Sequence, residues 1–228
     1  MSPSKPRFEG LSVISTLALK GVLDAAAPAQ SCGYRVEFHA TQALLKDIAA
    51  GKRADVVILT EEGIAELSRQ GLLQAGSETP LGRSGVGLAV RAGAARPDIS
   101  SVAALERALV SADSVGHSRM GASGLYFAAL LERLGIAGRL RKRVIVDKGP
   151  VAAGVAAGEI ALGAQLLCEL APVRGIDIVG PLPDEVQKLY AFSAAAMAGA
   201  AQPGAARAFL AFLRSDAARA EMRRCHIT

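Results

Sequence analysis

Three short apolar segments, each followed by a helical pattern, constrain the fold of this chain more than any other feature. They span residues 11–15, 34–38 and 54–59. Strands that alternate with helices in this way predict a parallel sheet with helical crossovers. The third segment, A-D-V-V-I-L, is nearly all apolar, which is typical of a strand covered on both faces. The helices that follow are expected at residues 16–27, 41–50 and 61–71.

The pattern changes after Pro80, where an extended segment near residues 81–92 leads into a second group of strands and helices. Another extended segment, near residues 186–198, leads back to two final helices. These features predict an α/β fold with two α/β lobes, whose mixed, mainly parallel sheets are joined by two extended hinge segments. We expect a ligand cleft between the lobes. Lobe 1 is expected to comprise residues 1–82 and 193–228, and lobe 2 residues 83–192.

The composition excludes several classes of protein. A chain of 228 residues that is 51% hydrophobic can bury a large core and is not disordered. No apolar run reaches the roughly 18 to 20 residues that span a bilayer, so we expect no membrane insertion. The three cysteines are widely spaced and odd in number, which argues against a disulfide framework and against a metal site. We therefore expect no metal and no cofactor.

The N-terminus, M-S-P-S-K-P-R-F-E-G, lacks the apolar h-region of a secretory signal peptide. We expect a cytoplasmic protein as the sequence is written, or a periplasmic one if a leader was removed. The formal charge of +5 is mostly scattered along the chain, and only 4% of the residues are aromatic. A base-stacking surface is hard to build from so few aromatic rings. These features argue against a nucleic acid partner and favour a small anionic ligand.

One turn stands out as a candidate binding site. Residues 118–124 read S-R-M-G-A-S-G and lie between a short apolar strand and a long helical pattern. The first N–H groups of a helix have no partner inside the helix, and together with the helix dipole they favour an anion. Glycine lets a ligand approach the backbone closely. The alternative interpretation is that Ser123 only caps the helix.

Polar side chains recur where the predicted strands end. A ligand in such a sheet binds beyond the carboxyl ends of the strands. The residues found there carry hydroxyl, imidazole or amide groups or are glycines, and carboxylates are scarce among them, which suits an oxyanion or a carboxylate ligand. They are Ser15 and Thr16, His39 to Thr41, His117 and Ser118, Lys148 and Gly149, and Gln165.

The chain resembles the type II periplasmic binding proteins, and among them the molybdate-binding proteins of ABC importers. The resemblance covers nearly the whole chain, and its most specific piece is A-D-V-V-I-L-T after A-A-G-K-R. Further matches are V-I-S-T-L-A-L-K-G-V-L-D, P-L-G-R-S-G-V-G-L-A-V-R, G-A-S-G-L-Y-F-A-A-L-L-E-R-L-G-I and V-A-A-G-E-I-A-L-G-A-Q.

This resemblance implies a solute-binding protein that closes on a small anion, either an oxyanion such as molybdate or an organic carboxylate. It also implies an ABC importer permease as a partner. Two positions depart from the molybdate pattern: H-A-T-Q stands where a small-residue and serine turn is usual, and Gln165 where a tyrosine is often found. The residues implied to line the site are Ser15 or Thr16 and Thr41 in lobe 1, and Ser118, Ser123, Val151 and Gln165 in lobe 2, beside Gly149.

Two alternative functions remain open. Aconitate isomerases are similar to this family and move a proton in a tricarboxylate. His39 and His117 would then be the candidate general bases, although no acid partner for either ring is evident in the sequence. Carboxylates could be held by Arg83, Arg119 or Lys148. The second alternative is a ligand-sensing module whose partner supplies DNA binding. The sequence argues against a serine hydrolase, because Ser123 and Gly124 break the G-x-S-x-G spacing.

Overall fold

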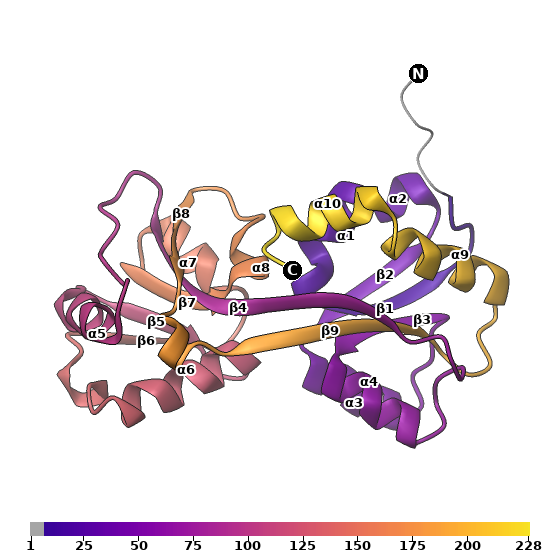
Figure 1. Cartoon of the computed structure of the whole chain (residues 1–228), viewed down its shortest axis with the longest axis horizontal. Coiled ribbons are helices and arrows are strands. Elements are labelled where there is room, and N and C mark those ends of the chain that lie inside the picture. Colours follow the sequence, from indigo (N-terminus) through magenta and orange to yellow (C-terminus); the bar gives the residue numbers. More distant parts are fainter. Residues whose placement is uncertain (1–6) are drawn as a thin grey trace. The chain divides into compact units, whose positions relative to one another are not determined.

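The computed structural model describes residues 7–228, and the chain divides into two compact units. Unit 1 consists of Met1–Arg83 and Tyr190–Thr228, and unit 2 of Ser84–Leu189. The predicted lobe boundaries lie within three residues of these divisions. The chain passes between the units twice, inside β4 (Thr79–Arg91) and at the start of β9 (Leu189–Ala196) (Figure 1). Both strands fall on segments that the sequence predicts to be extended.

Unit 1 is built on a sheet whose strand order is β2-β1-β3-β9. The central strand β1 pairs in parallel with both of its neighbours, and β9 runs antiparallel to β3. In this register Thr16 lies opposite His39, so the carboxyl ends of β1 and β2 are neighbours. The first three strands are β1 (Ser12–Thr16), β2 (Arg35–His39) and β3 (Val56–Thr60).

Helices surround this sheet. Apolar side chains of α3 and α4, among them Leu44 and Ile64, pack with Val57 of β3 in one buried cluster. A second group of rings joins Phe8 and Tyr34 to Phe209, with ring centroids 5.0 to 6.0 Å apart. The helical segments are η1 (Leu17–Leu19), α1 (Lys20–Ala26), α2 (Ala29–Cys32), α3 (Thr41–Ala49), α4 (Glu61–Arg69), α9 (Pro203–Leu213) and α10 (Asp216–Arg224).

Unit 2 contains a second sheet region with the strand order β4-β7-β5-β6, and β8 also pairs with β4. Strand β5 is parallel to both β6 and β7, whereas β4 is antiparallel to β7 and β8. The carboxyl ends of β5, β6 and β7 therefore share one edge. The bounds are β5 (Val115–Ser118), β6 (Arg143–Val146), β7 (Leu162–Leu166) and β8 (Ile176–Pro181).

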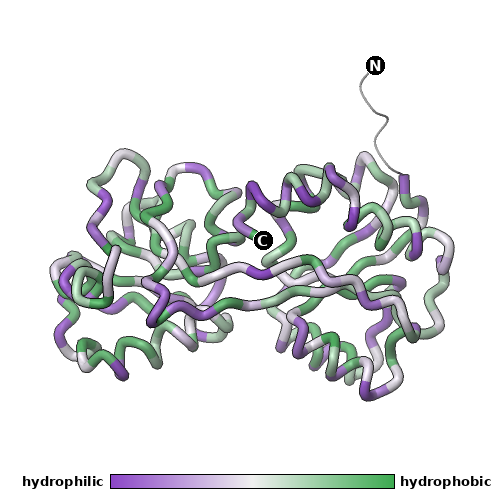
Figure 2. Tube along the Cα trace, viewed as in Figure 1, coloured by the Kyte–Doolittle hydropathy of each residue, from purple (hydrophilic) through white to green (hydrophobic). Residues whose placement is uncertain are grey.

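Apolar residues, green in Figure 2, are frequent along the chain of unit 2. Strand β7 is buried along its whole length, and Val155 and Ile160 pack together beside it. Most of the strand pairs in the two units are parallel, so the predicted mixed, mainly parallel α/β class is confirmed. The helical segments are α5 (Val102–Ser111), α6 (Ala122–Arg133), η2 (Ala137–Arg139), α7 (Val151–Ala157), α8 (Leu167–Leu170) and η3 (Asp184–Val186).

The structure corrects some local expectations. The short helices α2 and α8 have four residues each, too few to show a periodic apolar pattern, and the sequence did not predict them. No helix within residues 7–228 combines the length and apolar composition that a transmembrane span requires.

Candidate functional site

In unit 1 the predicted ligand residues follow the adjacent ends of β1 and β2. Ser15 is buried, and its hydroxyl donates to the carbonyl of Thr16 at 3.0 Å, so it is already engaged inside the protein. The hydroxyl of Thr16 makes no side-chain cap to the following helical turn. Within the described residues, the hydroxyls of Thr16 and Thr41 form no hydrogen bond.

The N-terminus of α3 lacks a side-chain cap, as do those of α1, α2 and α9, but α3 starts directly after the carboxyl end of β2. Its N-cap residue is Ala40, with φ −64° and ψ 144°. Thr60 and Ser215 have nearly the same backbone angles before α4 and α10, but their hydroxyls accept hydrogen bonds from Gly63 and Ala218. Alanine offers no such acceptor, and no acidic residue stands in the first turn of α3. This helix start therefore keeps its capacity for an external anion.

Unit 2 has a similar helix start after β5. The N-cap of α6 is Gly121, no side chain caps the helix, and its first turn contains no acidic residue. Ser123 lies inside the first turn, so the alternative that it caps the helix is wrong. The hydroxyls of Ser118 and Ser123 make no hydrogen bond within residues 7–228. Ser123 is nevertheless buried, which places a polar group with unused capacity at the base of this turn.

Two glycines let α6 begin directly against Ser118. A Cβ atom added to Gly124 would lie 2.1 Å from the carbonyl oxygen of Ser118, and one added to Gly121 would lie 2.6 Å from its hydroxyl oxygen. Contacts this short do not occur, so any larger residue at Gly124 would push the helix away from the end of β5. The glycine and serine pattern of this turn thus has a direct structural reason.

The remaining predicted site residues of unit 2, Gly149, Val151 and Gln165, have three different environments. Gly149 has φ +82° and is exposed at the turn before α7. The side chain of Val151 is only 1% exposed and packs in the core, so only its backbone faces the helix start. The amide of Gln165 accepts from the backbone N–H of Ala152 at 3.1 Å and donates to Glu169 at 2.7 Å. Gln165 thus fastens β7 to the start of α7.

His117 is held in one protonation state by its neighbours. Its Nε2 lies 2.9 Å from Nε of Arg143, which can only donate, so Nε2 accepts. Nδ1 then carries the proton and donates to the carbonyl oxygen of Ser118 at 3.0 Å. Burial lowers the pKa of His117, and the nearby positive charges of Arg143 and Arg119 lower it further, against the Ser118 hydrogen bond. Both ring nitrogens are occupied and the residue is 3% exposed, so the neutral ring serves the structure.

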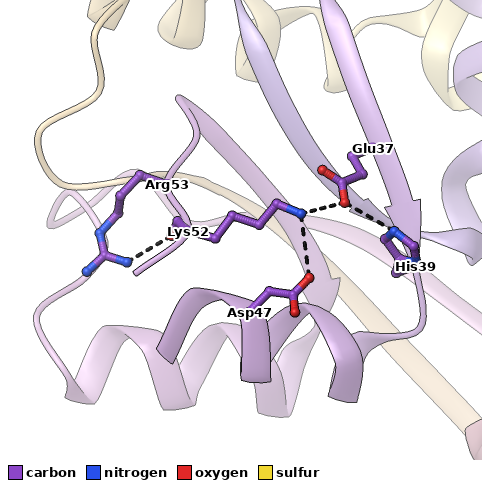
Figure 3. Close-up of polar contacts among 5 residues, drawn as sticks. All are labelled: Glu37, His39, Asp47, Lys52 and Arg53. Carbon is purple, nitrogen blue, oxygen red and sulfur yellow. Dashed lines mark hydrogen bonds and ion pairs between the residues drawn. The ribbon is translucent and has the colours of Figure 1, made fainter. Parts of the chain in front are cut away.

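His39 has a different environment at the end of β2. Its Nε2 lies 3.1 Å from Oε1 of Glu37, and the same oxygen accepts a hydrogen bond from Lys52 (Figure 3). Lys52 also lies 3.5 Å from Asp47. The hydrogen bond from Lys52 is the main reason why the pKa of Glu37 is lowered, against a smaller effect of burial. The expectation that neither histidine has an acid partner is therefore wrong for His39. Residues two apart on a strand share a face, which was the available signal.

Carboxylates are less scarce at these strand ends than the sequence predicted. Asp147 directly follows β6 and accepts a hydrogen bond from Arg119, a residue that was expected to hold a ligand. Glu169 follows β7, and burial raises its pKa, although the hydrogen bond from Gln165 acts in the opposite direction. Asp147 is paired with Arg119, and Glu37 is paired with Lys52. Neither carboxylate therefore places an unpaired negative charge beside the starts of α3 and α6.

Exposed apolar side chains accompany the polar ones. In unit 2, Met120 is 70% exposed and lies in the glycine and serine turn, and Leu125, directly after that turn, is 54% exposed. In unit 1, Leu17 is exposed directly after Thr16. Ligand sites generally combine apolar walls with a few polar groups that fix orientation.

A hollow of about 360 Å³ lies elsewhere in unit 1. It is formed by α9, α10 and the start of β4, and contains none of the predicted site residues. Its rim carries Arg214, Arg219 and Arg223, all exposed. Within residues 7–228, no three His, Cys, Asp or Glu side chains gather as a metal site would require.

Comparisons with known proteins agree with this architecture. A family model described as bacterial extracellular solute-binding protein matches residues 11–226. Among curated proteins, the chain is similar to an aconitate isomerase from a Pseudomonas species, with 37% identity over 222 residues. The matched region covers 92% of this chain and 84% of that relative.

Solved structures show the same fold. The periplasmic molybdate-binding protein of Azotobacter vinelandii matches with a TM-score of 0.76 and 18% identity, covering 96% of this chain and 98% of the other. The sulfate-binding protein of Mycobacterium tuberculosis matches with a TM-score of 0.64 and 17% identity, covering 95% and 85%. At these identities the likeness concerns the fold alone.

Proposed function

Because the chain belongs to the family of bacterial extracellular solute-binding proteins, we propose that its solute is a small organic polycarboxylate. One observation carries the proposal. The starts of α3 and α6 lack both a capping side chain and an acidic residue, and unbonded hydroxyls of Thr41, Ser118 and Ser123 stand beside them. Hydroxyls and helix N-termini together bind carboxylates through charge-assisted hydrogen bonds.

Two further observations favour an organic anion over a bare tetrahedral oxyanion. Met120 and Leu125 offer exposed apolar surface at the turn before and within α6, which an oxyanion such as molybdate would not use. The aconitate isomerase is also twice as similar in sequence as the molybdate-binding protein, at 37% against 18% identity. The family supports an ABC importer permease as the partner, and this partner is part of the proposal. The predicted cleft and the cellular compartment remain predictions.

A second candidate function is isomerisation of a tricarboxylate. It is favoured by the name of the 37% identical relative and by the pairing of His39 with Glu37. A binding protein needs no such pair, whereas an enzyme that moves a proton does.

The first test is a titration of the purified chain with molybdate, tungstate, sulfate, phosphate, and a panel of dicarboxylates and tricarboxylates. A ligand that binds only the folded chain stabilises it, by about 2.7 kcal/mol at a concentration of 100 times Kd. We expect an increase in melting temperature with a tricarboxylate, confirmed by calorimetry. Stabilisation by tetrahedral oxyanions alone would refute the proposal.

Substitutions then test the residues. Thr41→Ala and Ser118→Ala are expected to weaken binding of the selected tricarboxylate about tenfold each, because a hydrogen bond to a charged group contributes about 1.5 kcal/mol. Ser215→Ala is the control, since it removes a helix-capping hydroxyl at α10 without touching α3 or α6. It should lower stability and leave the affinity unchanged. Wild-type affinity in both site variants would remove these residues from the site.

A further inference from the structure

We propose that His39 carries the proton that is moved in a bound unsaturated tricarboxylate, and that Glu37 and Lys52 position its ring. This inference rests on the second candidate function, isomerisation of a tricarboxylate, and assigns a catalytic residue to it. Three features of the cluster in Figure 3 carry the argument: the tautomer of His39, its exposure, and its place in the chain beside α3.

The contacts of Glu37 fix the tautomer. Its Oε1 accepts from the ammonium group of Lys52, which favours the ionised carboxylate. An ionised carboxylate can only accept, so Nε2 of His39, 3.1 Å away, must carry the proton. Nδ1 of the neutral ring is then left with its lone pair and makes no hydrogen bond within residues 7–228. A base oriented by an acid through its other nitrogen is the arrangement that general acid–base catalysis uses.

The ring is also accessible. The side chain of His39 is about half exposed, whereas His117 is buried and has both nitrogens engaged. Of the two histidines that the sequence offers as bases, only His39 can therefore reach a ligand.

The chain brings this base next to an anion-binding helix start. His39 is the last residue of β2, and the next residue, Ala40, is the uncapped N-cap of α3. A carboxylate held at the start of α3 would keep the rest of a small ligand within a few ångströms of residue 39. Lys52 lies just after the C-terminal end of α3 and forms an ion pair with Glu37. Residues before and after α3 therefore meet in one cluster of His39, Glu37 and Lys52.

The proposed step is balanced. Nδ1 of His39 takes a proton from a CH₂ group beside the carbon–carbon double bond, so that a C–H bond breaks and an N–H bond forms. The electron pair of the broken C–H bond forms the new carbon–carbon double bond. The π electrons of the original double bond form a new C–H bond at its far carbon, with the proton that Nδ1 returns. The ring ends neutral, and no oxidant, reductant or co-reactant is consumed.

The experiment follows trans-aconitate in D₂O by proton NMR and measures kcat and KM, with calorimetry for binding. We expect His39→Gln to lower kcat about 10²- to 10⁴-fold, the usual contribution of a general base. Binding should stay within threefold of wild type. Glu37→Gln should lower kcat about tenfold with KM unchanged, since it disturbs the ring and not the ligand. Glu66→Gln is the matched control, because Glu66 forms a surface ion pair with Arg69 in the same unit.

Chemical rescue separates a proton-transfer role from a structural one. Added imidazole should restore part of the activity of His39→Ala and none of the loss in other variants. Wild-type turnover in His39→Gln, or no isomerisation by a wild-type chain that binds trans-aconitate, would overturn this inference and leave the binding proposal standing. Failure of the wild-type chain to bind any polycarboxylate would overturn both.

Discussion

At the residue scale, Asp55 shows how one side chain joins distant parts of unit 1. It is 2% exposed, and its Oδ2 accepts from the backbone and the hydroxyl of Ser12 at 2.8 and 2.7 Å. Its Oδ1 accepts from the backbone N–H of Gln202 at 2.8 Å. Burial would raise the pKa of Asp55, but the hydrogen bonds from Ser12 and Gln202 outweigh it and lower the pKa.

We therefore expect Asp55→Asn to destabilise the chain by about 2 kcal/mol, since an amide cannot accept at both of these positions. A group whose pKa is lowered by folding stabilises the fold above its unfolded pKa and loses that effect as the pH falls. The difference between the variant and the wild type should consequently shrink below about pH 4. Urea unfolding at pH 7 and pH 3.5 measures it, and a difference that does not change with pH would contradict the ionic role.

At the element scale, some helices have a side chain that caps the N-terminus and others do not. Helices α4, α5 and α10 are capped by Thr60, Ser101 and Ser215, each accepting from the residue three positions later. Helices α3 and α6 have no capping side chain, as is also true of α1, α2, α7 and α9, and each lacks the stability that a cap would add. The proposed ligand supplies the missing acceptor.

This difference gives a prediction for Ala40. Its backbone angles already suit a cap, so Ala40→Asp should stabilise the chain by about 1 kcal/mol through a new hydrogen bond and the helix dipole. The same carboxylate would occupy and repel the site of the anion, so affinity for the tricarboxylate should fall at least about tenfold. Ala40→Asn adds a capping group without a charge, so its affinity for the tricarboxylate should lie between those of the wild type and Ala40→Asp. An Ala40→Asp variant with wild-type affinity would show that the start of α3 does not bind the ligand.

At the scale of the whole molecule, two buried groups have opposite effects on acid stability. The pKa of His117 is lowered on folding, so the unfolded chain takes up its proton first and stability falls as the pH drops from 7 towards 5. The pKa of Glu169 is raised, so the folded chain takes up that proton first and stability rises as the pH falls. Because the two contributions have opposite signs, the pH dependence of the free energy of unfolding can be assigned to one residue only by comparison with a variant that lacks it.

His117→Asn removes one of the two effects. The stability advantage of the wild type over this variant should decrease between pH 7 and pH 5, by at most about 1.4 kcal/mol per pH unit. Thermal or urea unfolding at half-unit steps gives the comparison. An advantage that grows on acidification would mean that His117 is protonated in the folded chain, against the hydrogen bond that it accepts from Arg143.

Much of this architecture was predictable from the sequence. Helix α3 lies within one residue of its expected bounds, β4 and β9 fall on the two segments expected to be extended, and the expected family and fold class are confirmed. Such features depend on apolar periodicity and capping residues, which are local properties of the chain.

The sequence by itself determined the alternation of strands and helices and the gathering of hydroxyls and glycines at strand ends, because burial and turn chemistry act over a few neighbouring residues. Only the tertiary structure decided which of those groups are free. Ser15 and Gln165 are engaged, Thr41 and Ser118 are not, and Glu37 meets a lysine fifteen positions away. Hydrogen-bond partners of this kind are set by the packing of separate elements, and no local pattern encodes them.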